Sequence, residues 1–325
     1  TLAFDAHDNV TSVTPPGKGA HAFVYTPDDH ESSYTPPKSA ATSTTFDADR
    51  RPLVTTRPDA TSWARTYDTA GRLASFAYPG ATLTPTYDNR GHLAAIAGPG
   101  AESLQAVYDG PLVTSLSMTG VATGTVAWTY DTRFRANREE VNGAYGVDVY
   151  FDHDGLPTDI GDLSLKREPT TGRVSEAIVS YDVTTTFAYT PFGEVASAVT
   201  KAGETNVLDL AFTYDVLGRI TEKKDTGVVW SYGYDLAGRL ATVKKDGASV
   251  ATYTYDANGN RLNDGASYDE EDRQLTGGGA TFAYTPNGER KTRVDASGTT
   301  TYGYDGRGHL TSVALPGGKA IAYGV

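Results

Sequence analysis

The sequence predicts an all-β protein built as an array of consecutive β-hairpins. Three observations predict it. The motif Tyr–Asp–x–x–Gly–Arg–Leu recurs along the 325-residue chain, and its regular copies start about 20 residues apart. Aromatic residues alternate with other residues just before each copy. The 35 glycines and 21 tyrosines recur at matching motif positions, as an array of turns and strands requires.

The centre of each motif reads as a tight turn. In the copy at 234–240, Asp235 can accept hydrogen bonds from backbone N–H groups two or more residues later, and Gly238 tolerates positive φ. Diverged copies at 189–193 and 284–288 place Pro at the second turn position, where φ near −65° is needed, and Thr in the Asp position. These substitutions suit a turn and not a catalytic motif.

The flanks of the motif read as strands. Trp230, Tyr232 and Tyr234 are two residues apart and so share one face of a strand. Leu240 and Val243 after the turn are three apart, which predicts either a bulge beside the turn or a strand partly covered on both faces. A lone hairpin is barely stable in water, so each hairpin is expected to dock on its neighbours.

We predict a structural role for the Tyr, Asp, Gly and, where present, Arg residues of six regular copies. They are Tyr67, Asp68, Gly71, Arg72, Tyr87, Asp88, Gly91, Tyr214, Asp215, Gly218, Arg219, Tyr234, Asp235, Gly238, Arg239, Tyr255, Asp256, Gly259, Tyr304, Asp305 and Gly308. Hairpin tips are therefore expected at 215–218, 235–238 and 256–259, among others.

The repeats indicate one array over 1–325, with no linker that divides it. Its parts are the diverged repeats of 1–66, the regular repeats of 67–150, the register-slipped repeats of 151–188 and the regular repeats of 189–325. A short step at Tyr268 interrupts the last part. The chain starts and stops within a repeat, so we expect a piece of a longer protein.

Some copies lack the turn glycine. Asp8 and Asp29 stand there in the diverged part, and Asp tolerates a left-handed conformation. Arg50 and Phe134 occupy the same position in two other copies, and there the sequence does not support a turn. The Pro-rich stretches near 14–17 and 34–37 are expected to be exposed connections.

The Tyr–Asp–x–x–Gly–Arg–Leu motif at this period resembles the YD-repeat (Rhs-repeat) family over nearly the whole chain. That family includes bacterial Rhs polymorphic toxins, shell subunits of insecticidal toxin complexes and teneurins. The resemblance implies a long antiparallel sheet that spirals into a hollow shell or barrel. In bacterial relatives the shell encloses a toxic C-terminal segment, and in teneurins it serves cell-surface adhesion. The family's autoproteolytic apparatus is not matched, so no catalytic residue carries over.

Composition limits the other possibilities. The net charge of −12 argues against a nucleic-acid-binding surface. The absence of cysteine excludes disulfides and thiolate chemistry. No apolar run is long enough for a membrane span, and no signal peptide is visible in this segment. With the resemblance, this predicts a secreted or cell-surface protein, with bacterial export.

Other features of the sequence suit either a ligand-binding role or a structural one. The aromatic stripe suits sugar stacking, but its fixed motif position favours a cross-strand ladder. The residue after the turn Gly is expected to reach the turn Asp or a neighbouring strand. The acidic residues 269–272 suit a calcium site or a carboxylate pair less well than a solvated turn. The six histidines lack ligand spacing, so no metal, cofactor or catalytic residue is predicted.

The sequence thus predicts a non-enzymatic scaffold, a segment of a β-spiral shell that encloses or displays another polypeptide. The expected partners are further repeats, an enclosed C-terminal polypeptide, or self-association through sheet edges. A teneurin-like adhesion or glycan-binding module, with a glycan or cell-surface receptor as partner, is the alternative. An enzyme with a shallow polysaccharide site on the sheet is the second.

Overall fold

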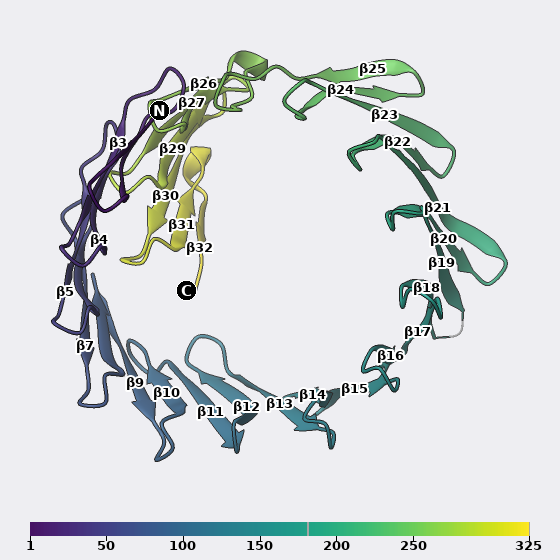
Figure 1. The fold of residues 1–325 in the computed structure, drawn as a ribbon, viewed down its shortest axis with the longest axis horizontal. Coiled ribbons are helices and arrows are strands. Elements are labelled where there is room, and N and C mark those ends of the chain that lie inside the picture. The colour runs from purple at the N-terminus through teal and green to yellow at the C-terminus, as the bar shows by residue number, and fades with distance from the viewer. Residues whose placement is uncertain (181, 325) are drawn as a thin grey trace. The chain divides into compact units, whose positions relative to one another are not determined.

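The computed structural model describes residues 1–180 and 182–324. Within them the chain is all-β, which confirms the predicted fold class (Figure 1). The strands form one 25-stranded sheet, β1–β25, and one seven-stranded sheet, β26–β32. Two single-turn 3-10 helices interrupt the strands of the described chain, η1 (Asn263–Gly265) and η2 (Pro316–Gly318).

The strands are short and follow one another closely. In the first part of the chain they are β1 (Leu2–Phe4), β2 (Val10–Val13), β3 (His21–Tyr25), β4 (Glu31–Thr35), β5 (Thr42–Phe46), β6 (Pro52–Thr56), β7 (Ser62–Tyr67), β8 (Leu73–Tyr78), β9 (Ala81–Tyr87), β10 (Leu93–Ala97) and β11 (Ser103–Asp109). In the middle they are β12 (Leu112–Thr119), β13 (Gly124–Tyr130), β14 (Ala136–Val141), β15 (Tyr145–Phe151), β16 (Pro157–Ile160), β17 (Leu163–Arg167), β18 (Val174–Val179), β19 (Val183–Tyr189), β20 (Val195–Ala202), β21 (Thr205–Tyr214), β22 (Ile220–Asp225), β23 (Val228–Tyr234), β24 (Leu240–Lys245) and β25 (Ala248–Thr252). The second sheet contains β26 (Ser267–Tyr268), β27 (Gln274–Gly277), β28 (Ala280–Tyr284), β29 (Arg290–Asp295), β30 (Gly298–Tyr304), β31 (Leu310–Ala314) and β32 (Ala320–Ala322).

A bulge beside each turn explains the three-residue spacing. In the hairpin β23–β24, Tyr232 pairs with Val243 and Tyr234 pairs with Leu240, with a register shift between Gly233 and Tyr234. The extra residue on β24 lets Leu240 and Val243 share the face of the two tyrosines. The same shift occurs beside the turns of β7–β8, β21–β22 and β30–β31.

Because successive strands pair antiparallel, the turns of each hairpin array lie in two rows, one at each end of the strands. The turns that follow the motif Tyr form one row, which we call the Asp–Gly edge. The connections between one motif copy and the next form the other row, which we call the opposite edge. This follows because every second connection in a run of hairpins returns to the same side of the sheet.

The contacts of the chain divide it into two compact units. The first contains Thr1–Val107, Ser117–Thr123 and the chain from Tyr255 onward, and the second contains Tyr108–Leu116 and Gly124–Thr254. Among the described residues the buried apolar side chains are few: Tyr78, Ala198, Val243, Ala280 and Val313. Ladder hydrogen bonds and contacts between neighbouring hairpins therefore hold the fold, with little help from a deep core.

The regular array breaks after β25. The turn at 256–259 forms, but its flanks belong to no named strand: Tyr255 and Arg261 form an isolated bridge, and η1 follows. The side chain of Asn260, at the position that Arg holds in three of the six regular copies, donates to both Asp256 and Asp272. This turn is therefore tied to the next turn along the chain.

Candidate functional site

The motif Asp organises each turn through both of its carboxylate oxygens. Asp235 Oδ1 accepts hydrogen bonds from the N–H groups of Ala237 and Arg239, both at 2.9 Å, and Oδ2 accepts one from Arg239 Nε at 2.7 Å. The N–H of Gly238 donates to the Asp235 carbonyl at 2.9 Å, with φ of 81° at the glycine. Only a residue that accepts positive φ closes this turn without strain.

The other predicted turn residues have the same geometry. Gly71, Gly91, Gly218, Gly259 and Gly308 have φ between 75° and 90°, and each N–H donates to the motif Asp carbonyl. The basic or amide side chain after the glycine contacts the Asp in each copy: Arg72 with Asp68, His92 with Asp88, Arg219 with Asp215, Asn260 with Asp256, and His309 with Asp305.

Turns without glycine form as well. Arg50 and Phe134 adopt φ of 66° and 62°, and their N–H groups donate to Asp47 and Asp131 as the glycines do. Both turns therefore form, although the sequence did not support a turn at either position. The motif Asp and the following Arg make their full set of hydrogen bonds in both turns, and these outweigh the left-handed strain of about 1–2 kcal/mol.

The motif Tyr ties each hairpin to the one before it. The Tyr234 hydroxyl donates to the Ile220 carbonyl at 2.7 Å, and the Arg219 guanidinium lies 4.5 Å from the Tyr234 ring centroid. Equivalent hydroxyl contacts join Tyr67 to Pro52, Tyr87 to Leu73, Tyr214 to Val195 and Tyr304 to Arg290. The rings therefore form a ladder between hairpins.

Sequence reasoning missed the stacking of one repeat's Arg on the next repeat's ring. Arg51 lies over Tyr67, Arg72 over Tyr87, Arg135 over Phe151 and Arg173 over Tyr189. The signal was present, because an aromatic residue follows each of these arginines by 15 or 16 positions. Arg51, Arg72 and Arg135 thus join their own turn Asp to the following hairpin.

The turn contacts favour the ionised carboxylates. The Arg239 N–H, and then its guanidinium, hold the pKa of Asp235 below the usual value, and the same groups of Arg72 do so for Asp68. At Asp215 the Arg219 side chain contributes most, followed by its N–H. Hydrogen bonds to the charged form have this effect because protonation removes an acceptor.

The first unit contains a second kind of contact, between hairpin arrays. Three turns of the second sheet, at 269–273, 285–289 and 305–309, contact the opposite edge of β2–β9 and its connections. We call this set of contacts the seam. Figure 1 shows β26 and β27 beside β3, where the turn at 269–273 contacts Gly19. In the seam, one array's Asp–Gly edge thus meets the opposite edge of another.

At one end of the seam, Lys18 holds the acidic turn. Its Nζ donates to the Asp269 carbonyl at 2.6 Å and lies 3.2 Å from Asp272 Oδ1, with the Lys18 side chain only 11% exposed. The Gly19 N–H donates to Glu270 at 2.7 Å. The prediction of a solvated turn at 269–272 was wrong, because the Pro-rich connections expected to be exposed cover it.

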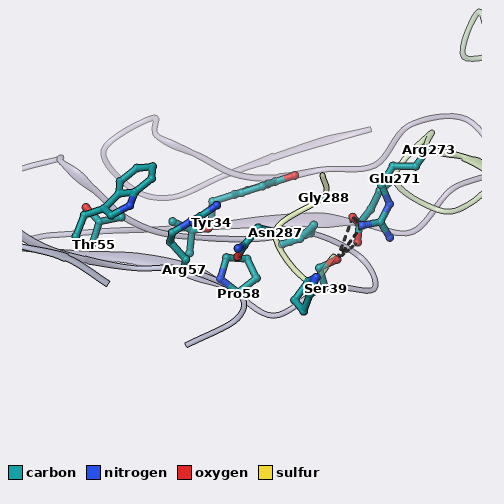
Figure 2. A pocket seen from close by; sticks show the side chains of 13 residues that line it. Tyr34, Ser39, Thr55, Arg57, Pro58, Glu271, Arg273, Asn287 and Gly288 are labelled. Carbon is teal, nitrogen blue, oxygen red and sulfur yellow. Dashed lines mark hydrogen bonds and ion pairs between the residues drawn. The ribbon is translucent and has the colours of Figure 1, made fainter. Parts of the chain in front are cut away.

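Glu271 makes the next contacts of the seam. Its carboxylate accepts hydrogen bonds from the Ser39 hydroxyl at 2.8 and 3.0 Å and from the Lys38 N–H at 3.2 Å, and lies 3.0 Å from Arg273 Nη1 (Figure 2). The Glu271 side chain is 11% exposed. These four contacts satisfy a largely buried charge.

The other two turns dock on the connection at 57–61 and on β7. Arg57 Nη2 lies 2.8 Å from Glu289 Oε1, with side chains 11% and 17% exposed. The Trp63 indole N–H donates to the Gly306 carbonyl at 2.9 Å, and Arg57 donates to the same carbonyl at 3.2 Å. Asn287 donates to Asp59 at 2.8 Å.

A half-open pocket of about 240 Å³ lies along the seam, lined in part by Tyr34, Arg57, Trp63, Glu271 and Asn287 (Figure 2). Burial, and then the negative charge of Glu271, raise the pKa of Tyr34, so its hydroxyl stays neutral. The arginine and glutamate side chains are committed to the contacts described above. In the described residues, no group of three or more His, Asp or Glu side chains is arranged to hold a metal ion.

Turns built on Tyr, Asp and Gly, a ring ladder between hairpins and an edge-on-edge seam define a YD-repeat shell protein. The chain belongs to the teneurin YD-shell family, whose profile matches residues 1–324. That family is structural and generally non-catalytic.

Solved structures show the same fold. The TcdB2–TccC3–Cdc42 crystal structure matches with a TM-score of 0.74 at 15% identity, over 96% of this chain. A Photorhabdus luminescens Tc holotoxin pore structure matches with a TM-score of 0.70 at 14% identity, over 99% of this chain. In both cases the chain spans about a fifth, 22%, of the matched chain. No curated protein matches the sequence.

None of the helices in the described part of the chain has the length and apolar character needed to cross a membrane.

Proposed function

We propose that this chain is a segment of the wall of a β-spiral shell that encloses or displays another polypeptide, as in the toxin-encapsulating members of its family. Its role is that of a scaffold and not of an enzyme. The partners are further repeats and an enclosed polypeptide, and the location is secreted or at the cell surface.

The seam is the observation that carries the proposal. A wall made of successive windings needs one edge of a winding to fit the other edge of the winding beside it, at a common repeat. The seam has this arrangement: three consecutive turns of β26–β31 contact successive connections of β2–β9, from Lys18 to Trp63. The fold match to chains described as part of a Tc holotoxin supports the same role.

The ring ladder gives the glycan-binding alternative less support. Sugar stacking needs a free aromatic face, whereas Tyr67, Tyr87 and Tyr234 lie under an Arg of the preceding repeat and hydrogen-bond its strand. The motif rings are thus used within the array, and the shell remains our proposal.

Limited trypsin digestion of the natural full-length gene product tests the proposal. We expect a polypeptide outside the repeats to resist digestion while the shell is intact. The seam variant Arg57→Ala with Glu271→Ala is expected to make that polypeptide cleavable, because it weakens contacts between windings. The matched control is Thr69→Ala, an exposed turn residue outside the seam. If no segment beyond the repeats is protected in the unmodified protein, the enclosing role is wrong.

A further inference from the structure

The contacts of the seam follow the same order along both arrays. The first, second and third turns of the seam contact Gly19, Asp59 and Pro79 respectively. Later turns of the second sheet thus contact later parts of the opposite edge of the first. A turn after the third is therefore expected to contact a part of that edge beyond Pro79.

β32 leads from the third turn to the next place in this order. It pairs with β31, and the Tyr323 N–H donates to the Thr311 carbonyl at 2.9 Å. A Cβ on Gly324 would lie 2.8 Å from Val121 Cγ1, so the backbone at Gly324 packs against the Val121 side chain. Val121 lies in the connection between β12 and β13, which comes later in the chain than Pro79. The order of the seam therefore continues through β32.

The sequence places the next motif turn directly after this strand. Tyr323–Gly324–Val325 has the spacing of Tyr302–Gly303–Tyr304, and Val325 stands one repeat after Tyr304. In the other copies, the residue at this position is followed at once by the four-residue turn. Residues that follow Val325 in the natural full-length gene product are therefore expected to form the fourth turn of the seam.

An open pocket of about 340 Å³ lies where β32 arrives, and Gly324 forms part of its lining. The exposed side chains of Met118 and Val121 line it, together with partly exposed apolar residues such as Leu83 and Leu104. Met118 and Val121 are 48% and 78% exposed. The lining belongs wholly to the first unit. Apolar side chains grouped in this way indicate a surface that another segment covers.

The pocket differs in chemistry from the earlier places in the seam. There the middle turn residues Glu271 and Asn287 bond to a hydroxyl and a carboxylate of the opposite edge. Among the described residues that line the pocket, Glu102 is the one ionisable side chain. A turn as acidic as 269–272 would meet a like charge there and no cation. An apolar side chain would instead remove the surface of Met118 and Val121 from water.

We propose that this pocket receives the turn that follows Val325 in the natural full-length gene product, and that the turn carries an apolar side chain at a middle position. The contact continues the seam and changes its chemistry from polar to apolar. This inference rests on the proposed function, which counts further repeats among the partners of the chain.

Photo-crosslinking from Met118 tests the contact in the natural full-length gene product. Met118 is the single methionine of this chain. Photo-methionine, a diazirine analogue of similar shape, therefore labels the pocket without a substitution. Peptide mass spectrometry after illumination is expected to show a cross-link from position 118 to the turn directly after Val325. Met118→Leu keeps the pocket apolar and is expected to lose this cross-link.

Two relocated labels serve as matched controls. Met118→Leu with Val121→Met moves the label within the pocket and is expected to keep the cross-link to the same turn. Met118→Leu with Val107→Met moves the label to the other face of β11 from Leu104, where the Val107 side chain is 56% exposed. This variant is expected to give no cross-link to that turn.

Amide hydrogen exchange of the full-length product tests the apolar chemistry. Val121→Asp is expected to speed exchange in residues 118–124 at least about tenfold, because a carboxylate in an apolar contact opens it. Val107→Asp adds the same charge outside the pocket and is expected to leave exchange in 118–124 unchanged. Circular dichroism checks that both variants are folded. Unchanged exchange in Val121→Asp would contradict a covered pocket.

Other results also overturn the proposal. A cross-link from position 118 to a second copy or to another segment assigns the pocket to a different occupant. A label that reacts only within the pocket lining, or a natural protein with no turn after Val325, leaves the pocket uncovered. Charged residues at both middle positions of that turn contradict the apolar contact.

Failure of this contact and failure of the enclosing role can be told apart. A polypeptide protected from trypsin without the cross-link keeps the enclosing role and overturns the docking of the fourth turn. A cross-link without any protected polypeptide keeps the docking and overturns the enclosing role, because an array can extend its seam without enclosing another polypeptide.

Discussion

Two turns of this protein have the same internal structure and different surroundings. In the turns at 235–239 and 269–273, the Asp accepts the same two backbone N–H groups at 2.9 Å and the same Arg Nε at 2.7 Å. They differ in the middle: Leu236 is fully exposed, whereas Glu271 is 11% exposed and bonds to Ser39 across the seam.

The comparison separates two roles within one motif. The Asp, the residue in the Gly position and the following Arg, His or Asn build the turn, and they do so whether or not anything covers it. The side chains of the two middle residues differ between these turns without changing this set of hydrogen bonds, and in the seam several of them contact the opposite edge. A wall can therefore keep one turn geometry while the middle side chains, together with neighbouring positions such as Glu289, vary its contacts.

Low pH is expected to protonate the motif Asp in both turns and so weaken the hydrogen bonds that the two turns share. This should be the largest loss of stability among the predictions. Asp68, Asp215 and Asp235 have lowered pKa values in the folded chain. A group with a depressed folded pKa stabilises the fold above its unfolded pKa of about 3.9, and that stabilisation is lost as the pH falls through the folded pKa. Thermal melts should show a melting temperature nearly constant from pH 7 to 5 and a steep loss below pH 4. A flat profile to pH 2 would contradict the role of the turn carboxylates.

Among the seam residues, Arg57 is expected to contribute most to the free energy of unfolding. Arg57→Ala leaves Glu289 half-buried without its cation and removes a donor to Gly306. We expect a loss of about 3 kcal/mol in the free energy of unfolding, the lower end for a broken buried pair. Urea unfolding measures it. Arg72→Ala, which removes a more exposed turn Arg outside the seam, is the control and should show a clearly smaller loss.

Glu271 and Leu236 can be compared directly. Glu271→Ala leaves Ser39 and the Lys38 amide without their acceptor, and should lower the free energy of unfolding by about 1–3 kcal/mol. Leu236→Ala should change it by less than about 0.5 kcal/mol, because the side chain is fully exposed. Equal losses for the two variants in urea unfolding would show that the middle positions do help to build the turn.

The smallest effect concerns the residue in the glycine position. Phe134→Gly is expected to stabilise the chain by up to about 1 kcal/mol, because φ of 62° strains a residue with a Cβ. Gly238→Ala should have the opposite sign, since φ is 81° and the added Cβ would lie 3.3 Å from Arg219. Thermal unfolding reports both. A loss of stability for Phe134→Gly would mean that the phenyl ring contributes more than the strain costs.

The periodicity of the sequence predicted most of the fold. The 20-residue spacing and the alternation of Trp230, Tyr232 and Tyr234 predicted the hairpins, and Asp235 with Gly238 predicted the turn. The failures were local and of one kind. At Arg50 and Phe134, a propensity argument underrated the hydrogen bonds of the neighbouring Asp and Arg. At 256–266, the motif did not indicate that Asn260 bonds to Asp272 or that no regular strand follows the turn.

The seam is where sequence reasoning reached its limit. Ser39 and Glu271 are 232 positions apart, and so are Arg57 and Glu289. Repeat spacing describes neighbours along the array and holds no information on which distant hairpins meet. Without information on which distant hairpins meet, four consecutive acidic residues and a Pro-rich connection are both predicted to be exposed loops.

The sequence by itself determined the hairpins, their turns and the ladder between them, because these depend on contacts within one or two repeats. Only the tertiary structure decided which turns are covered and which are open. That outcome depends on the curvature that accumulates over many strands, and so on small twists at every repeat that no single motif records.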